Sequence, residues 1–297
     1  MGAARLLAGL VQVRPPEALT AIVNVADDVE LHGLHISPDL DTVTYTVAGA
    51  IDADRGWGLA GETWRAMEAL RRFPGAPTWF NLGDQDLATH LYRTGRLRAG
   101  ATLAEVTAEI VAAFGVRVRV LPVSNDPVRT HVATAEGELG FQEYFVQHQH
   151  DVVATDVRLE GIDAARPAPG VLDALDRAER VVIAPSNPIV SIGPVLAVPG
   201  VRGAVEARRA DVVAVSPIIA GAALKGPADR LLRELGHESS VVGVARLYAP
   251  LAATLVVDEA DAALAAAVEA EGVRCVVAPT IMRDPAAAAA LGEVVLA

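Results

Sequence analysis

Carboxylate side chains are concentrated in one short stretch of the chain, residues 24–42. This stretch carries Asp27, Asp28, Asp39 and Asp41, together with two histidines and a serine. Oxygen ligands from a few carboxylates suit a hard cation such as Mg²⁺, which commonly also takes the phosphate oxygens of a substrate. The two aspartate pairs lie at opposite ends of one loop, so they could converge on a single cation. These residues therefore predict metal-assisted chemistry on a phosphate.

The residues on either side predict the elements that position these aspartates. The apolar run Thr20–Val25 indicates a buried strand, and Ser37 followed by Pro38 is typical of a helix start. Open α/β sheets bind ligands at such a junction of strand end and helix start. On the helix, Asp39 and Asp41 are two residues apart and point to different sides, so one can cap the first turn while the other faces the cleft. In the alternative interpretation, aspartates here only form turns and caps.

A second group of polar residues lies in a stretch that we expect to be a helical insert, about 55–115. Within it we predict a helix over 84–94. Asp86, His90 and Arg93 are spaced i, i+4 and i+7, so they share one face of that helix. Spacing alone favours a solvated polar face for them.

The remainder of the chain alternates between helical and strand patterns. Such alternation predicts an α/β fold with a doubly wound, mostly parallel, Rossmann-like sheet, in one domain over residues 1–297. We expect a small β excursion made of segments near 130–135 and 139–149. The loop 185–188 follows a predicted strand over 180–184, which places Ser186 and Asn187 at the edge of the sheet where ligands bind.

Composition narrows the possible classes of function. The chain has 297 residues and a net charge of −12, which argues against binding to nucleic acid or to a membrane surface. It has one cysteine and no apolar run long enough to span a membrane, so we expect a cytoplasmic protein without disulfides. Lys225 is the single lysine. An acidic protein that handles anionic phosphates must neutralise them locally, with a metal, with arginine or with backbone N–H groups.

Several longer strings resemble one known family, that of the 2-phospho-L-lactate and phosphoenolpyruvate transferases, which build the deazaflavin coenzyme F420. The strings run in the family order over nearly the whole chain: NVADDVELHGLHISPDLDT (24–42), GWGL (56–59), LGDQDLATH (82–90), LPVSND (121–126), FQE (141–143), APSNP (184–188), SIGP (191–194) and VSPII (215–219).

The resemblance implies an activity. The acid-bearing phosphate of a guanosine diphosphate ester of lactate or enolpyruvate would pass to the ribityl hydroxyl of a deazaflavin, with release of GMP. It implies Mg²⁺ as cofactor, small-molecule substrates and a homodimer. It also implies roles for particular residues: Asp39 and Asp41 in catalysis; Asp28, Asp39 and Asp41 as metal ligands; Asp41, Asp84, Gln85, Asp86, His90 and Arg93 at the deazaflavin; Gly2, Asn24, Ser124, Asn125, Ser186, Asn187 and Pro188 at the nucleotide.

Two points leave alternatives open. A related family of the same fold contains sugar-nucleotide-binding regulators without catalytic activity, although a glycine- and serine-rich loop follows its Asp-Asp pair, unlike Val29–Asp41 here. In the transferase family, a strand and a glycine-rich turn precede the helix that residues 2–10 predict. The sequence begins without them, which indicates either a late start or a real loss of part of the phosphate-binding loop.

Overall fold

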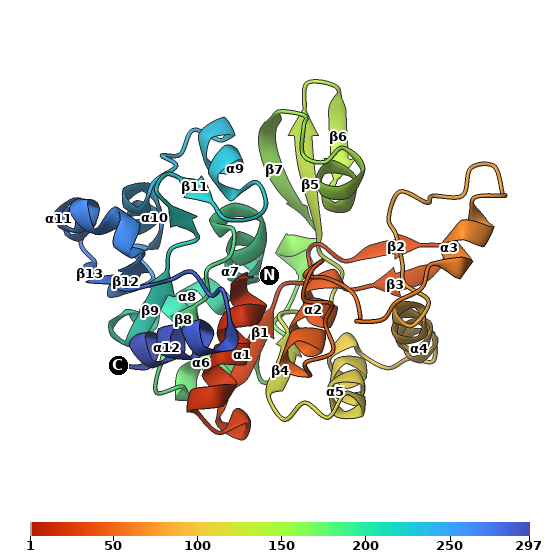
Figure 1. Ribbon diagram of the computed structural model, residues 1–297, viewed down its shortest axis with the longest axis horizontal. Coiled ribbons are helices and arrows are strands. Elements are labelled where there is room, and N and C mark those ends of the chain that lie inside the picture. Colours follow the sequence, from red (N-terminus) through yellow and green to blue (C-terminus); the bar gives the residue numbers. More distant parts are fainter. Residues whose placement is uncertain (1) are drawn as a thin grey trace.

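Two parallel sheets form the centre of the protein, and the computed structural model describes residues 2–297 (Figure 1). One sheet pairs β1 (Thr20–Val23) with β4 (Arg119–Pro122). The other has four strands in the order β13-β12-β9-β8. Their bounds are Val181–Ile183 for β8, Val212–Val215 for β9, Thr254–Val257 for β12 and Arg274–Val277 for β13. The prediction of a mixed α/β fold with parallel strands is confirmed.

The antiparallel strands lie outside these sheets. β5 (Arg129–Thr134) pairs with both β6 (Gly137–Gly140) and β7 (Ala154–Glu160). This sheet stands at the top of Figure 1, between β11 on the left and β2 on the right. Two hairpins are smaller. They are formed by β2 (Val29–Leu31) with β3 (Leu34–Ile36), and by β10 (Ile218–Ile219) with β11 (Ala222–Ala223).

Helices surround the parallel strands, and three of them lie within the stretch of about 55–115 that was predicted as a helical insert, which is called the insert below. The insert helices are α3 (Arg65–Leu70), α4 (Asp86–Arg98) and α5 (Leu103–Ala113). The others are α1 (Gly2–Val13), α2 (Pro38–Val47), α6 (Val171–Arg177), α7 (Gly193–Ala197), α8 (Val201–Ala207), α9 (Ala228–Glu234), α10 (Val241–Tyr248), α11 (Ala265–Ala270) and α12 (Pro285–Leu296).

The first and last helices pack closely against each other. α1 and α12 run side by side in Figure 1, and glycine permits their approach. A Cβ on Gly9 would lie 2.2 Å from the carbonyl oxygen of Ala288, closer than any real Cβ contact. Gly2 is equally constrained, because its Cβ would lie 2.2 Å from the carbonyl oxygen of Pro185. The beginning of α1 therefore lies directly against the loop that follows β8.

The two parallel sheets share one hydrophobic core. Val23 of β1, Val120 of β4, Ile183 of β8 and Val212 of β9 all belong to the same buried cluster. Among the described residues, β1 and β8 each have one edge without a strand partner.

The segment 139–149 was predicted as a strand, and that prediction is wrong. β6 ends at Gly140, and Glu143–Gln147 forms a π-helical turn. The aromatic residues explain the difference, because helical spacing places Phe141 and Phe145 in a stacked pair with ring centroids 5.6 Å apart and buries Tyr144 completely. An alternating strand would have separated these rings.

The structure contains no single helix, within residues 2–297, that is long and apolar enough to cross a membrane. One bent pair of helical segments, Pro188–Ala197 and Val201–Ala207, meets the criterion jointly by length and composition, with a bend of 95°.

Candidate active site

A cavity of about 670 Å³ lies where the two parallel sheets and the insert meet. It is bordered by the start of α1, the loop after β1, the first turns of α2 and α4, and the loops after β8 and β9. Its polar and charged lining side chains are Arg5, Asp27, Asp39, Asp41, Thr42, Tyr45, Asn81, Asp86, His90, Gln142, Ser186, Asn187, Ser191, Ser216, Lys225, Thr280 and Arg283.

Two of these carboxylates, Asp27 and Asp39, have no ion pair with a lysine, arginine or histidine among residues 2–297. Asp27 follows β1, is only 6% exposed, and its Oδ1 atom has no hydrogen-bond partner. Asp39 accepts one hydrogen bond from Asn24, with 3.1 Å between Nδ2 and Oδ2. Burial raises the pKa of Asp27 well above its ordinary value, and the neighbouring Asp39 carboxylate raises it further. Burial also raises the pKa of Asp39. This pair therefore favours a bound proton or a bound cation.

Asp28 faces away from the main cavity. Its Oδ2 accepts hydrogen bonds from the hydroxyl of Ser37 at 2.8 Å and from Nε2 of His35 at 2.9 Å. It lines instead a smaller neighbouring cavity of about 280 Å³. Asp28 thus joins the β2–β3 hairpin to the start of α2, and its role as a metal ligand stays a prediction.

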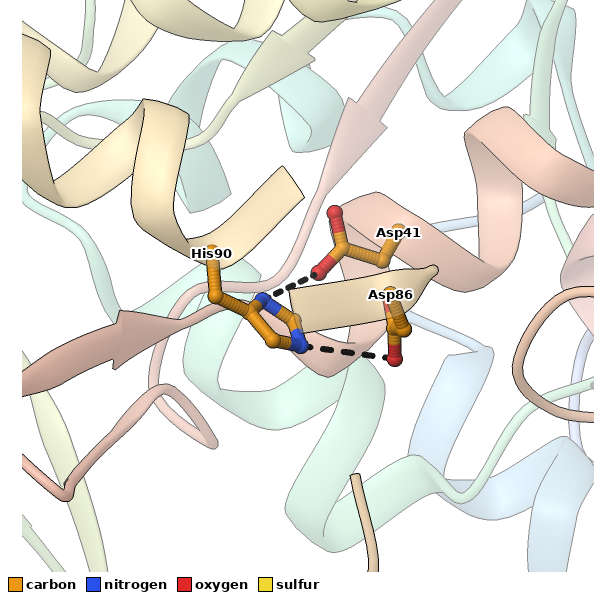
Figure 2. A group of neighbouring side chains, drawn as sticks. All are labelled: Asp41, Asp86 and His90. Carbon is orange, nitrogen blue, oxygen red and sulfur yellow. Dashed lines mark ion pairs between the residues drawn. The ribbon is translucent and has the colours of Figure 1, made fainter. Parts of the chain in front are cut away.

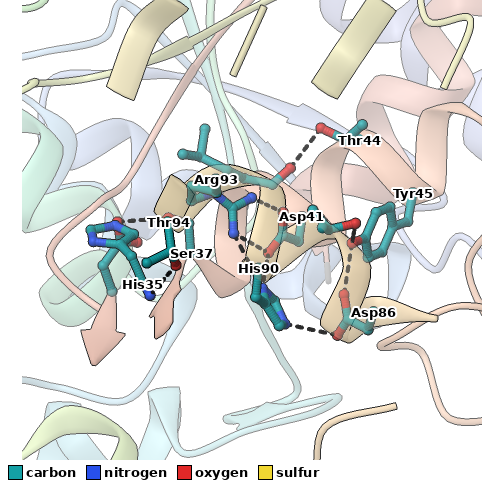
Figure 3. Close-up of polar contacts among 12 residues, drawn as sticks. His35, Ser37, Asp41, Thr44, Tyr45, Asp86, His90, Arg93 and Thr94 are labelled. Carbon is teal, nitrogen blue, oxygen red and sulfur yellow. Dashed lines mark hydrogen bonds and ion pairs between the residues drawn. The ribbon is translucent and has the colours of Figure 1, made fainter. Parts of the chain in front are cut away.

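The predicted face of α4 is buried against α2. The guanidinium of Arg93 binds both oxygens of Asp41, with its Nη1 3.1 Å from Oδ2, and it is only 1% exposed (Figure 3). Burial alone would lower the pKa of Arg93, but the Asp41 carboxylate raises it more, so the guanidinium stays charged. Asp41 lines the cavity paired with Arg93, although burial still outweighs this partner and raises the pKa of Asp41 above its ordinary value.

His90 links this ion pair to Asp86. Its Nε2 lies 3.3 Å from Oδ2 of Asp86, and its Nδ1 lies 3.7 Å from Oδ2 of Asp41 (Figure 2). Its Nδ1 also lies 3.3 Å from Nη1 of Arg93. Because arginine can only donate, Nδ1 is an acceptor in this contact and Nε2 carries the proton toward Asp86. Asp86 also accepts a hydrogen bond from the hydroxyl of Tyr45 at 2.7 Å. Burial disfavours its charge, but these two donors outweigh burial and lower the pKa of Asp86.

Asp84 and Gln85, predicted at the deazaflavin, do not line the cavity. The Asp84 carboxylate accepts hydrogen bonds from the backbone N–H groups of Arg65 at 3.1 Å and Ala66 at 3.0 Å, at the start of α3. The side chain of Gln85 donates to the carbonyl oxygen of Gly61 at 3.1 Å. Both residues hold the insert together, and any contact of theirs with a ligand stays a prediction.

The predicted nucleotide residues divide into two sets. Gly2, Ser186 and Asn187 line the cavity, and the buried Nδ2 atom of Asn187 has no partner. Its Oδ1 accepts from the backbone N–H of Ile189 at 2.9 Å, which fixes the side chain. Pro188, beside them, is buried as the first residue of a π-helical turn.

The remaining predicted nucleotide residues lie outside the cavity lining. Ser124 donates to the carbonyl oxygen of Arg166 at 2.7 Å, and Asn125 accepts from the N–H of Ala104 at 2.8 Å, at the start of α5. Asn24 contacts the cavity only indirectly, through its hydrogen bond to Asp39.

The sequence interpretation missed several lining residues. It grouped Asp27 with Asp28 as possible ligands of one cation but named only Asp28 in the final set of metal ligands, although the position of Asp27 directly after a strand was a usable signal. It omitted the aromatic side chains Trp57, Trp79 and Phe80, which line the same cavity. Trp57 stands in the family string GWGL, which was a usable signal, whereas Trp79 and Phe80 lie in an irregular loop without a periodic pattern.

Two sets of side chains could hold a cation. Oxygen and nitrogen atoms of Asp41, Asp86 and His90 lie within 4.8 Å of one another. In that set the Asp41 oxygens are engaged by Arg93 and the His90 nitrogens by Arg93 and Asp86. The pair Asp27 and Asp39 offers oxygen ligands only, including an unpartnered buried oxygen, which is the donor set that Mg²⁺ prefers. The residues present therefore fit Mg²⁺ better at Asp27 and Asp39.

Comparison with known proteins identifies relatives along the entire chain. Residues 1–284 match the family model described as 2-phospho-L-lactate transferase CofD. The chain is 44% identical over 303 residues to a phosphoenolpyruvate transferase of Kitasatospora aureofaciens, covering 100% of this chain and 94% of the relative. It is 43% identical over 284 residues to the phosphoenolpyruvate transferase of Mycolicibacterium smegmatis, covering 92% and 85%.

A solved structure gives the same fold. A member of the UPF0052 family from Bacillus halodurans superimposes with a TM-score of 0.63 and 18% sequence identity, covering 100% of this chain and 96% of that one. At this identity the likeness concerns the fold alone. The family model and the relatives above carry the assignment: the chain belongs to the 2-phospho-L-lactate transferase CofD family.

Proposed function

We propose that the protein is a Mg²⁺-dependent transferase of coenzyme F420 biosynthesis. It moves the phosphoenolpyruvyl or phospholactyl group from a guanosine diphosphate ester to the ribityl hydroxyl of 7,8-didemethyl-8-hydroxy-5-deazariboflavin. The match of residues 1–284 to the transferase family is the single observation that carries this proposal. Among the two donors we favour the enolpyruvyl ester, because relatives such as that of Kitasatospora aureofaciens are named phosphoenolpyruvate transferases.

The cavity supports the donor side of the reaction. Gly2 brings the start of α1 against the loop after β8, and Ser186 and Asn187 of that loop face the same space. Free backbone N–H groups at a helix start attract anionic groups. The unpartnered Nδ2 of Asn187 adds a further donor. We place the guanosine diphosphate portion at this end.

The opposite wall supports the transfer step. Asp27 and Asp39 would hold Mg²⁺, which neutralises phosphate oxygens and stabilises the leaving GMP when bound. The ribityl hydroxyl oxygen forms a bond to the acid-bearing phosphorus as the bond from that phosphorus to the GMP oxygen breaks. The hydroxyl proton passes to a nearby carboxylate. Asp39 is our candidate for that acceptor because it lines the cavity at the start of α2, beside the proposed metal position.

The α4 side of the cavity supports binding of the deazaflavin. Asp86 stays anionic and faces the cavity beside His90, so it can accept hydrogen bonds from ribityl hydroxyls. Trp57, Trp79 and Phe80 supply flat apolar surface for a ring system. The same proposal treats the two parallel sheets as one doubly wound, Rossmann-like domain and the protein as a cytoplasmic homodimer.

The test is an assay with purified protein, Mg²⁺, deazaflavin and each guanylylated donor in turn. We expect GMP and a phosphodiester product, with faster turnover of the enolpyruvyl ester. Excess chelator should abolish turnover, and undiminished activity in chelator would refute the metal requirement. If the protein binds guanine nucleotides but neither binds deazaflavin nor releases GMP, the non-catalytic regulator is the better description.

A further inference from the structure

The cavity is lined by more acidic than basic side chains. Among the described residues, four aspartates line it but only three lysine or arginine side chains do, in a chain of net charge −12. The three cationic residues are Arg5, Lys225 and Arg283. A diphosphate ester of a carboxylic acid brings several negative charges into this space. The site must compensate for them with the few cations that it has.

Of these three cations, Lys225 is the one without a partner among the described residues. Arg5 donates from Nη1 to the carbonyl oxygen of Met282 at 3.3 Å, and Nε of Arg283 lies 3.6 Å from Asp284. Lys225, the single lysine of the chain, forms no hydrogen bond or ion pair with any described residue while it lines the cavity. Its ammonium group is therefore available to an anion that enters.

The loop that carries Lys225 is anchored at both ends. Before it, the β10–β11 hairpin is held by a hydrogen bond from the N–H of Ala220 to Asp261 at 2.9 Å and by one from the hydroxyl of Ser239 to the carbonyl oxygen of Gly221 at 3.1 Å. After it, Pro227 is buried and α9 begins. These anchors place a flexible, charged side chain at a defined position on the cavity wall.

We infer that Lys225 binds an oxyanion of the donor, either an oxygen of its diphosphate or the carboxylate of its acid. The inference rests on the proposed function, and it names a binding residue for the donor of that reaction. A lysine acts on either group as a compact point charge with three N–H donors. Phosphate and carboxylate are thus two sources of one recognition chemistry.

The experiment compares K225M and K225R with the unchanged protein by calorimetric titration with GDP and by the KM for the enolpyruvyl donor. R177M is the matched control, because Arg177 is a highly exposed cation outside the cavity lining and its loss changes the net charge equally. We expect K225M to weaken binding by about 10-fold, the effect of one charge-assisted hydrogen bond. K225R should retain binding within about threefold, since it keeps the charge.

The two probes distinguish the two sources. Equal weakening of GDP and of the donor indicates a diphosphate oxygen, whereas weakening of the donor alone indicates the carboxylate. If K225M binds GDP and the donor as tightly as R177M does, the inference is wrong. The proposed function is tested separately by product formation in the unchanged protein, so either claim can fail while the other stands.

Discussion

Two groups of buried carboxylates face the same cavity with different polar partners. On the α4 side, Asp41 is paired with Arg93, and Asp86 accepts a hydrogen bond from Tyr45 and lies 3.3 Å from Nε2 of His90. On the β1 side, Asp27 has an unpartnered oxygen and Asp39 receives one amide hydrogen bond. Both sides are buried, so desolvation disfavours charge in each. Among these four carboxylates, only Asp86 has donors that overcome it, since its pKa is lowered. For Asp41, burial outweighs the neighbouring Arg93 and keeps the pKa raised.

This difference indicates a division of labour. A compensated carboxylate is rigid and keeps its charge in the empty protein, which suits recognition of hydroxyl groups. An uncompensated buried pair is unfavourable until a cation or proton arrives, which suits a metal and a proton acceptor. The predictions below test this division, beginning with the largest expected effect.

Loss of the uncompensated carboxylates should affect catalysis most. We expect D27N and D39N each to lower turnover by about 10²- to 10⁴-fold, because each removes a charge from the metal site or the proton acceptor. The measurement is the rate of GMP release at saturating substrates. The control D54N removes an exposed carboxylate and should be neutral. Turnover in D27N and D39N equal to that of D54N would show that the site lies elsewhere.

Removal of Arg93, the charge partner of Asp41 on the α4 side, should lower the stability of the fold. R93M leaves the Asp41 carboxylate buried without its partner, a change that typically costs about 3–5 kcal/mol in free energy of unfolding. R96M on the same helix breaks the ion pair between Arg96 and Glu109, whose side chains are 40% and 35% exposed, respectively. Its loss should lower the free energy of unfolding by no more than about 1 kcal/mol. Denaturant titration measures both variants. Similar losses in the two would contradict the assignment of a buried, essential ion pair.

The metal should bind on one side only. We expect Mg²⁺ at about 100 times its dissociation constant to stabilise the protein by about 2.7 kcal/mol, seen as a higher melting temperature. The increase should disappear in D27N and D39N and persist in D86N. The opposite pattern would place the cation among Asp41, Asp86 and His90, whose ligand atoms lie within 4.8 Å of one another.

Much of this arrangement could be predicted from sequence because it depends on local patterns. A strand, an acidic loop and a proline-led helix follow one another in sequence, so the position of Asp39 at the cavity followed from its neighbours. The helical spacing of Asp86, His90 and Arg93 likewise placed them on one face. Pattern could not show that this face is buried against α2, since burial depends on residues far away in the chain.

Sequence patterns could not predict which of two adjacent residues faces the cavity. Asp27 and Asp28 are adjacent residues of the same type, so the sequence does not distinguish them. Their orientations differ because Ser37 and His35 bind Asp28 and leave Asp27 facing the cavity. Asp84 and Gln85 were predicted at the site because they neighbour Asp86 in a family string. In the structure they contact α3 and the loop before it, and their role at the deazaflavin stays a prediction.

The smallest predicted effect concerns acid stability and the charge of Asp86. Its pKa in the folded protein is lowered below the ordinary value of 3.8, because the hydrogen bonds from His90 and Tyr45 outweigh the cost of burial. Ionised Asp86 therefore contributes stability above about pH 4, and that contribution is lost as the pH falls through the lowered pKa. D86N cannot ionise, so the stability difference between the unchanged protein and D86N should shrink in this acidic range. Denaturant titrations of both proteins between about pH 2 and 6 measure the difference, and D54N corrects for the general effect of acid. A difference that stays constant over this range would mean that Asp86 is not held as an anion. The α4 side would then be no better compensated than the β1 side.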